Sequence, residues 1–565
     1  MSNKKINKRH DYAQKTVSEE PLKIFIATAP FLAGMYYEWA SGIAVVFLLC
    51  YLWYCFMVAG EIQILRSVSL LAATVIPATY GISTFWAVDS GLAFFGMIKF
   101  LPLPLFVLAA EQVEKEFRKN LLDYVPVSGM IMMIVSEVLG VIPVLEPYFR
   151  VNGRLAGFFQ YPNTFALYLL VGIIVLISKG GWNKIRIVNL LLLFVGILLT
   201  GSRTGFILLV VTVLSFCLLI REKRIRLGLI GVLVLLVVLT GAYAIMTGST
   251  SSVGRYLTAS FSSSTFLGRM LYYKDAIPVI LRHPFGLGYM GYYFTQGAFQ
   301  TGVYYIINIH NEFLQFLLDI GWIPTGILIW GVIRGIISGG LRERMLIIMI
   351  LLHSMLDFNL QFISIFFVML SAVDLDGEKI GRVSGKGALM TGAVLLGCTS
   401  LYFGIDSALY YMKMYSASAE IYPGNTNAWM QLLTVVEEPE EMERVADRIL
   451  AMNPDNPLAN NAKARVAYSN GDFGSMIGYK QQALEYYKYN LEEYLDYFNM
   501  LYVGYQLYLE NSDPDSAEVC RKQMLGIPDM LDEVLNETDP LAYQIQDKPE
   551  LELPEEYRVI LDALR

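Results

Sequence analysis

The sequence predicts an all-α protein in which a polytopic helical membrane region precedes a soluble helical region. Of its 565 residues, 55% are hydrophobic and 16% are charged, a composition typical of membrane proteins. Long uncharged runs recur, and about 20 apolar residues are enough to cross a bilayer. Charge also divides the chain, because residues 410–565 hold 28 acidic and 12 basic residues, whereas the rest holds 22 acidic and 31 basic.

Thirteen apolar runs are candidate membrane spans. The long run 342–374 is divided in two, because basic residues both precede and follow it, and basic residues concentrate on the cytoplasmic side. The candidates are 22–37, 41–59, 67–86, 92–110, 121–143, 164–179, 186–200, 204–220, 226–246, 313–334, 342–356, 360–374 and 388–406.

Charge also orients these spans. Residues 1–20 form a basic tail without a cleavable apolar segment, which predicts an uncleaved cytoplasmic N-terminus. The connectors at 115–119, 179–186 and 221–224 are basic and fit the same side of the membrane. Thirteen spans then make 21–406 a membrane domain and place residues 407–565 outside the cell.

The segment 247–312 is predicted to be a long extracytoplasmic loop. Before Glu312 at its end, it contains Arg255, Arg269, Lys274 and Arg282 against one acid, Asp275. Basic residues on the outer side need a separate reason, and a phosphate-bearing ligand is one. The same topology brings residues that are distant in sequence to one surface, namely Arg154, Arg203, Arg255, Arg269, His310, His353 and Asp357.

The loop ends at His310 and Asn311, where the chain re-enters the membrane. An imidazole can accept a proton near neutral pH, although a histidine here can also be merely interfacial. Arg203 lies in a tight glycine-flanked turn before a helix, which favours pyrophosphate binding; the alternative is an arginine that reaches the lipid headgroups.

Arg269 lies in a predicted amphipathic helix and is a second candidate for phosphate contact. The alternatives are a salt bridge to Asp275 or a contact with lipid headgroups. Arg154 is a candidate for substrate binding or for shaping the cavity. His353 and Asp357 are four residues apart, so one helix face would carry both. We expect His353 and Asp357 to form an interhelical structural pair. The alternative is that Asp357 orients a base or a sugar hydroxyl.

After Gly404 the sequence changes to helical repeats. Residues 453–457 begin a helix to about Tyr468, residues 470–472 form a turn, and a second helix runs to about Tyr487. A further helix begins near Leu491, about one tetratricopeptide period later. The spacing resembles degenerate tetratricopeptide repeats; an irregular helical domain is the alternative.

Several classes of protein are disfavoured. The five cysteines form no disulfide framework or metal cluster, and no phosphate-binding loop of the nucleotide-binding type is present. Acidic residues within the spans are few, which argues against a proton-coupled transporter. No metal ion, cofactor or nucleic acid is expected.

The ordered motifs resemble the O-antigen ligase and O-antigen polymerase family. They are the segments 153–157 with 161–163, 201–205, 268–269, 310–315 and 353–360. The resemblance covers about 20–375, and some members of the family also carry extracytoplasmic tetratricopeptide repeats.

The resemblance implies a GT-C type glycosyltransferase of the bacterial plasma membrane. It would transfer a glycan from a polyprenyl-pyrophosphate donor, such as undecaprenyl pyrophosphate, to a glycan or glycolipid acceptor in a metal-independent, inverting reaction. Arg203 and Arg269 would hold the pyrophosphate and His310 would activate the acceptor hydroxyl. Arg154, Arg255, Lys274, Asn311 and Asp357 are further candidates for substrate binding.

Two rival functions stay open from the sequence. One is a transporter of lipid-linked oligosaccharides, which would carry charges along a path through the membrane. The other is a scaffold that binds a protein partner through residues 407–565. Nothing in the sequence separates a ligase from a polymerase or identifies the sugar.

Overall fold

The computed structural model describes residues 17–219, 222–223, 226–234, 238, 241 and 264–565, and it is built almost entirely of helices. The first half contains α1 (Glu20–Thr28), α2 (Glu38–Ala59), α3 (Val68–Ser83), α4 (Ala93–Phe100), α5 (Pro102–Glu111), α6 (Lys115–Arg118), α7 (Val125–Leu139), α8 (Glu146–Phe149), α9 (Pro162–Lys179), α10 (Lys184–Thr200) and α11 (Arg203–Leu219). The predicted all-α class is confirmed.

The remaining helices fall into two groups. The first consists of α13 (Ser264–Arg282), α14 (Gly291–Phe299), α15 (Glu312–Ile320), α16 (Trp322–Ser338), α17 (Leu341–Ser354), α18 (Ile363–Ala372) and α19 (Lys386–Tyr411). The second consists of α20 (Tyr415–Ile421), α21 (Thr426–Leu433), α22 (Pro439–Met452), α23 (Pro457–Ser469), α24 (Phe473–Tyr486), α25 (Leu491–Glu510), α26 (Pro514–Glu537) and α27 (Glu555–Leu564).

Several helices have the length and composition to cross a membrane. Among the described residues there are four of at least 18 residues, namely α2, the combined run Ala93–Glu111, α9 and α19. Shorter apolar helices are Val68–Ser83, Val125–Leu139, Arg203–Leu219, Trp322–Ser338 and Ile363–Ala372. Helix α9 is the centre of the bundle, since most of its side chains are buried.

The thirteen predicted runs do not all become unbroken helices. The run 313–334 is interrupted at Gly321, whose φ of 78° lies in the left-handed region that favours glycine. A Cβ atom there would also collide with the carbonyl oxygen of Pro284. The run 22–37 likewise ends its helix at Thr28 and continues in short 3₁₀ turns. The division of 342–374 into two helices is confirmed, whereas residues 235–237, 239–240 and 242–246 of the 226–246 run lie outside the described residues.

One end of the bundle carries a two-stranded antiparallel sheet, in which β1 (Ile62–Arg66) pairs with β4 (Glu378–Val383). Exposed ion pairs surround it. Lys379 Nζ lies 2.5 Å from Glu61 Oε1, and Arg118 lies 3.1 Å from Asp376, which Lys115 also contacts. This is the end that the charge pattern predicts to be cytoplasmic.

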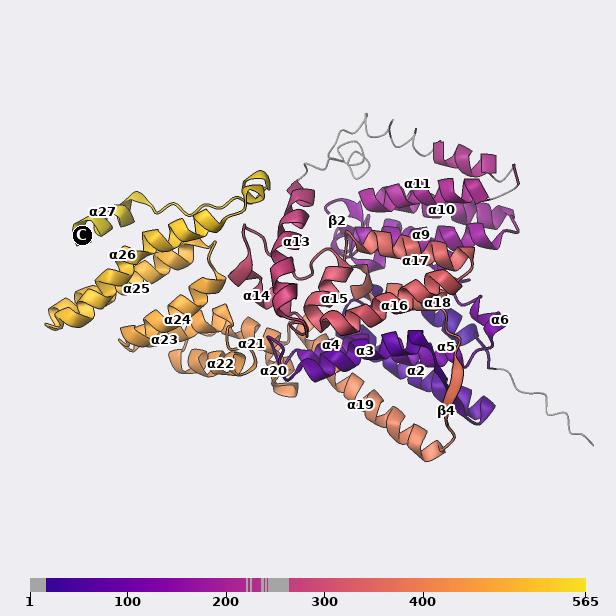
Figure 1. Cartoon of the computed structure of the whole chain (residues 1–565), viewed down its shortest axis with the longest axis horizontal. Coiled ribbons are helices and arrows are strands. Elements are labelled where there is room, and N and C mark those ends of the chain that lie inside the picture. Colours follow the sequence, from indigo (N-terminus) through magenta and orange to yellow (C-terminus); the bar gives the residue numbers. More distant parts are fainter. Residues whose placement is uncertain (1–16, 220–221, 224–225, 235–237, 239–240, 242–263) are drawn as a thin grey trace, which may run out of the picture.

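The opposite end carries α13 and α14, so the predicted long loop is largely helical where it is described. Figure 1 shows α13 and α14 between the bundle, at the right, and α20–α27, at the left. Asp275 anchors this region, because its carboxylate accepts hydrogen bonds from Thr301 N (2.9 Å), Thr301 Oγ1 (2.7 Å) and Tyr304 Oη (2.8 Å). Burial raises the pKa of Asp275 although these donors act in the opposite direction.

The C-terminal helices follow the predicted boundaries closely. Asn456 caps α23 by accepting a hydrogen bond from Ala459 N, and Gly471, at a φ of 73°, forms the turn before α24. Helices α23 and α25 begin at Pro457 and Leu491, as the period predicts. Helices α25 and α26, of 20 and 24 residues, are longer than α23 and α24, of 13 and 14, so the pairs are not equal repeats.

The C-terminal helices are docked on the membrane region through backbone contacts. Ser90 N donates to Met452 O at 3.1 Å, and Asp539 N donates to Thr301 O at 2.8 Å. Helix α14 also packs on α24. These backbone hydrogen bonds hold the C-terminal helices against the membrane region. Side chains from both parts can therefore line one cavity.

Candidate active site

Asp357 is the point at which the candidate site residues meet. It follows the end of α17 at Ser354 and is 2% exposed. Its carboxylate accepts hydrogen bonds from Tyr161 Oη at 2.8 Å, Asn163 Nδ2 at 2.7 Å and Phe358 N at 3.1 Å. A buried carboxylate is costly without such partners, so these three donors allow Asp357 to be buried in its charged form.

His310 is the first basic side chain that contacts this carboxylate. Its Nδ1 lies 3.3 Å from Asp357 Oδ1, and Tyr273 Oη donates a hydrogen bond to its backbone oxygen. We assign the Nδ1 proton to the Asp357 contact, which leaves Nε2 of the neutral ring as a proton acceptor. The side chain is 23% exposed, so a substrate can reach it.

Arg269 is the second basic partner of Asp357, and it comes from α13. Its Nη2 lies 3.9 Å from Asp357 Oδ2, and its Nη1 donates to the backbone oxygen of Leu356. Burial by itself would raise the pKa of Asp357, but His310 and Arg269 hold that pKa well below its usual range. The carboxylate is therefore ionised throughout the physiological pH range.

Arg154 connects this network to the turn that carries Arg203. It lies on β3 (Arg154–Leu155), which pairs with β2 (Arg150–Val151). Its Nη2 donates to Asn163 Oδ1 at 2.6 Å, and its Nε donates to Thr200 O at 2.8 Å. Thr200 ends α10, and after Gly201, at a φ of 58°, Arg203 begins α11. Arg203 is partly buried at this helix N-terminus, where backbone N–H groups favour anions.

The other predicted residues lie apart from Asp357. Asn311 caps α15, since its Oδ1 accepts from Phe313 N at 3.0 Å and Leu314 N at 3.1 Å. Lys274 points to the C-terminal helices and forms an ion pair with Asp539. Arg255 lies outside the described residues.

The expected pair between His353 and Asp357 is wrong. Helix α17 ends at Ser354, so Asp357 leaves the helix face that i and i+4 residues would share. His353 is fully buried, and its Nδ1 lies 2.9 Å from Asn359 Nδ2 instead. The alternative reading, that Asp357 orients a base, fits the contact with His310.

Three residues of the network had no predicted role, namely Tyr161, Asn163 and Tyr273. The first two flank a proline in one of the motifs, and this was the only signal available in the sequence. Their common partner, Asp357, lies 196 residues after Tyr161 and 194 residues after Asn163 in the sequence. Among the described residues, no group of three or more His, Cys, Asp or Glu side chains is arranged to hold a metal ion.

These features define a helical protein with membrane-spanning helices, in which a histidine–carboxylate pair lies among arginines. Residues 188–331 match the family model described as O-Antigen ligase. The match includes Arg203, Arg269 and His310, and it supports membership of the O-antigen ligase family. It therefore also supports an enzyme of the membrane that ligates or polymerises surface polysaccharide. No curated protein and no solved structure matches the chain.

Proposed function

We propose that the protein transfers a glycan from a polyprenyl-pyrophosphate donor to an acceptor hydroxyl at the outer face of the plasma membrane. The observation that carries the proposal is the contact between His310 Nδ1 and Asp357 Oδ1, beside Arg269. This arrangement provides a proton acceptor and a cation within one network that is open to substrate on the histidine side.

The reaction follows from the roles of these groups. Nε2 of His310 takes the proton of the acceptor hydroxyl, whose oxygen attacks the anomeric carbon of the donor sugar. The bond from that carbon to the pyrophosphate oxygen breaks with inversion. Arg203 and Arg269 stabilise the charge that develops on the leaving pyrophosphate, since preorganised donors lower the energy of the transition state.

Asp357 completes the mechanism by acting on His310. Its ionised carboxylate favours the tautomer with Nδ1 protonated and stabilises the imidazolium that forms when Nε2 takes a proton. Tyr161, Asn163 and Phe358 N keep the carboxylate in place through the transfer.

We also propose the orientation of the chain and the nature of its C-terminal part. The exposed basic residues around β1 and β4 favour a cytoplasmic location for that end. We therefore propose that the His310 network and residues 407–565 lie outside the cell. The 34-residue offset and the α23–α24 pair support a tetratricopeptide-like domain, despite the longer α25 and α26.

The proposal is tested by incubating the purified protein with a polyprenyl-pyrophosphate glycan in the presence of EDTA and sizing the products on a gel. A ladder that is absent with His310→Ala identifies a metal-independent polymerase. A single shifted product that requires an added acceptor identifies a ligase. Movement of intact donor across a bilayer without a new glycosidic bond would refute transfer and favour transport. Full activity of His310→Ala would refute the mechanism.

A further inference from the structure

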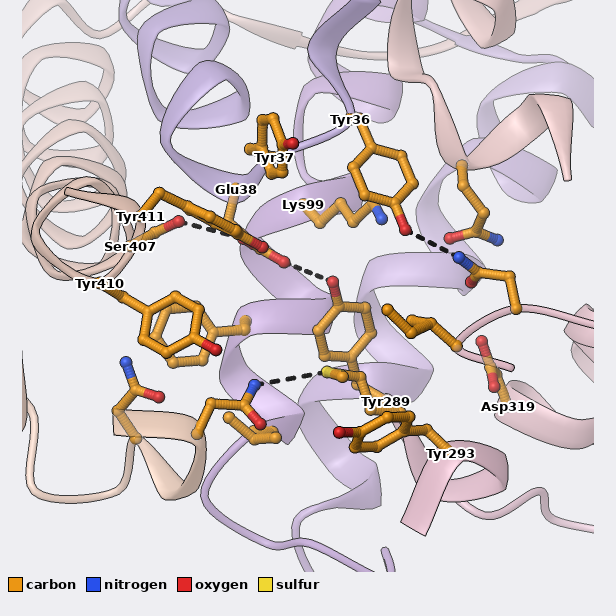
Figure 2. Close-up of a pocket in the computed structure, with 18 of the residues that line it drawn as sticks. Tyr36, Tyr37, Glu38, Lys99, Tyr289, Tyr293, Asp319, Ser407, Tyr410 and Tyr411 are labelled. Carbon is orange, nitrogen blue, oxygen red and sulfur yellow. Dashed lines mark hydrogen bonds between the residues drawn. The ribbon is translucent and has the colours of Figure 1, made fainter. Parts of the chain in front are cut away.

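A cavity of about 310 Å³ with both polar and aromatic lining residues lies near the candidate active site, at the lower end of the size range of ligand pockets. Figure 2 shows its side chains, which come from three parts of the chain. Glu38 and Lys99 come from the membrane helices α2 and α4, and Tyr289 and Tyr293 from the α14 region. The end of α19 and the C-terminal helices supply a third wall that includes Tyr410, Tyr411, Asn425 and Asn427.

Lys99 is the side chain that points to a ligand. It is 3% exposed, it lines the cavity, and none of the described residues gives its ammonium group a hydrogen bond or an ion pair. Of the aromatic rings around it, that of Tyr36 is the nearest, with Nζ 4.5 Å from the ring centroid. A buried ammonium group without hydrogen-bond acceptors is costly, and a ligand in the cavity would supply them.

The carboxylates of the cavity are already occupied by neutral donors. Glu38 accepts from Tyr289 Oη and from Ser407 Oγ, the latter at 3.0 Å. Asp319 accepts from Tyr80 Oη at 2.8 Å and from Gln315 Nε2 at 2.9 Å. Two carboxylates near one ammonium group leave the cavity without excess positive charge, which disfavours an anionic ligand.

The remaining lining combines tyrosine rings with amide side chains. Asn308 belongs to this set and donates to Tyr36 Oη at 2.8 Å, and Asn427 Nδ2 lies 3.5 Å from Met290 Sδ. Aromatic rings offer apolar faces with a polar edge, and amides offer both donors and acceptors. A sugar ring has the complementary chemistry, with C–H faces and a rim of hydroxyl groups.

The cavity is continuous in packing with His310. The ring of Tyr36 lies 6.3 Å from that of Phe358, whose centroid lies 5.1 Å from the ring of His310. Asn308, which lines the cavity, precedes His310 by two residues. Phe358 therefore connects Tyr36, on the cavity wall, to the ring of His310, and a glycan with one sugar in the cavity could extend toward His310.

We propose that this cavity binds a neutral pyranose unit of a glycan substrate, with Lys99 donating to its hydroxyl oxygens and the C-terminal helices supplying one wall. The inference rests on the proposed glycan transfer and extends it to a sugar subsite and to a direct part in substrate recognition for residues 407–565. The same pyranose chemistry can come from the acceptor or from the sugar of the donor.

The test measures sugar binding without turnover, by saturation-transfer NMR on the full chain in nanodiscs. The probes are methyl glucoside, methyl galactoside, methyl N-acetylglucosaminide and methyl glucuronide. We expect at least one neutral probe to bind, and Lys99→Met to weaken its binding about 10–100-fold, as for the loss of a charge-assisted hydrogen bond. Asn427→Ala, a milder change on the C-terminal wall, is expected to weaken binding less. Lys413→Met, the same change at an exposed position, is expected to bind like the wild type.

The outcomes separate the two proposals. Displacement of the probe by the polyprenyl-pyrophosphate donor assigns the subsite to the donor sugar, and simultaneous binding assigns it to the acceptor. Absence of binding by every neutral probe, binding of the glucuronide alone, or equal binding by wild type, Lys99→Met and Asn427→Ala would overturn the subsite. If the neutral probe binds as expected while His310→Ala retains full transfer, the subsite stands and the proposed mechanism fails.

Discussion

The two ends of the membrane helices use charged residues in opposite ways. Around β1 and β4, Lys379 and Arg382 share Glu61, whose side chain is 21% exposed. At the other end, His310 and Arg269 share Asp357, whose side chain is 3% exposed. Water can replace an exposed pair at little cost, whereas removal of one partner of a buried pair leaves a charge uncompensated. The difference indicates which end of the molecule performs chemistry.

The largest effect is expected from His310→Ala. Loss of a positioned base typically lowers the rate about 10²–10⁴-fold, so turnover should fall by that factor while donor binding persists. The measurement pairs turnover, from product sizing, with donor affinity. His283→Ala, at an exposed histidine, is the matched control and should behave as the wild type. A loss of donor binding equal to the loss of turnover would contradict the role of a base.

A smaller effect is expected from Arg203→Ala and Arg269→Ala. Each removes a guanidinium group from the proposed pyrophosphate site, so donor affinity should fall about 10–100-fold, as expected for a hydrogen bond to a charged group. Arg150→Ala is the matched control, because Arg150 is close to Arg154 in sequence but has its own partner in Glu137 at 2.6 Å. If donor affinity is unchanged in both Arg203→Ala and Arg269→Ala, the two arginines do not bind the donor pyrophosphate.

A third prediction concerns pH. Because His310 and Arg269 lower the pKa of Asp357 in the folded state, its ionisation stabilises the fold above the unfolded pKa of about 3.9. This contribution to stability is lost progressively as the pH falls from about 4, the unfolded value, through the lower pKa that Asp357 has in the folded protein. The difference in melting temperature between wild type and Asp357→Asn should therefore be constant from about pH 5 to 7 and shrink in stronger acid. A difference that grows with acidification would mean that the pKa is raised instead.

The smallest effect is expected at the opposite end. Lys379→Ala removes an exposed partner of Glu61 and should leave both turnover and donor affinity at the wild-type level, because screened surface pairs contribute little. Turnover reduced as strongly as in His310→Ala would erase the contrast between the two ends.

Local signals in the sequence were sufficient for many helix boundaries. The start of α23 at 453–457, the turn at Gly471 and the start of α25 near Leu491 were all predicted, because each depends on residues within one or two turns of a helix. The division between α17 and α18 was predicted from basic residues at both ends of the run. Interruption of the 313–334 run at Gly321 was missed, because an isolated glycine does not by itself end an apolar pattern.

The candidate site was predicted as a set of residues rather than as a geometry. The predicted order of membrane spans put four residues at one end of the helices, namely Arg154, Arg269, His310 and Asp357. In the structure these four residues belong to one network of contacts. The partner of Asp357 was predicted incorrectly, because the pairing with His353 assumed a helix that ends three residues before Asp357. Contacts between such distant segments depend on tertiary packing, which local patterns do not contain.

Lys99 could have been found from the sequence. It is the only basic residue within the predicted 92–110 span, and an ionisable residue inside a membrane segment is a functional candidate. The sequence analysis also underestimated the number of buried acids. Glu38, Glu111 and Asp406 lie near the ends of α2, α5 and α19, where exposure is expected, yet each is at most 7% exposed. Buried acids therefore do not separate a transporter from a transferase, and the distinction depends on detecting a new glycosidic bond.

The most direct test of the mechanism is a double-mutant cycle on turnover with His310→Ala, Asp357→Asn and the combined variant. If Asp357 acts by orienting His310 and stabilising its charged form, Asp357→Asn alone should lower turnover by up to about 10⁴-fold, as for a carboxylate that fixes the tautomer of a catalytic histidine. It should then lower turnover no further once His310 is replaced, since residues that act as a unit are non-additive. Additive losses in the combined variant would show that the two residues act independently and would contradict the proposed pair.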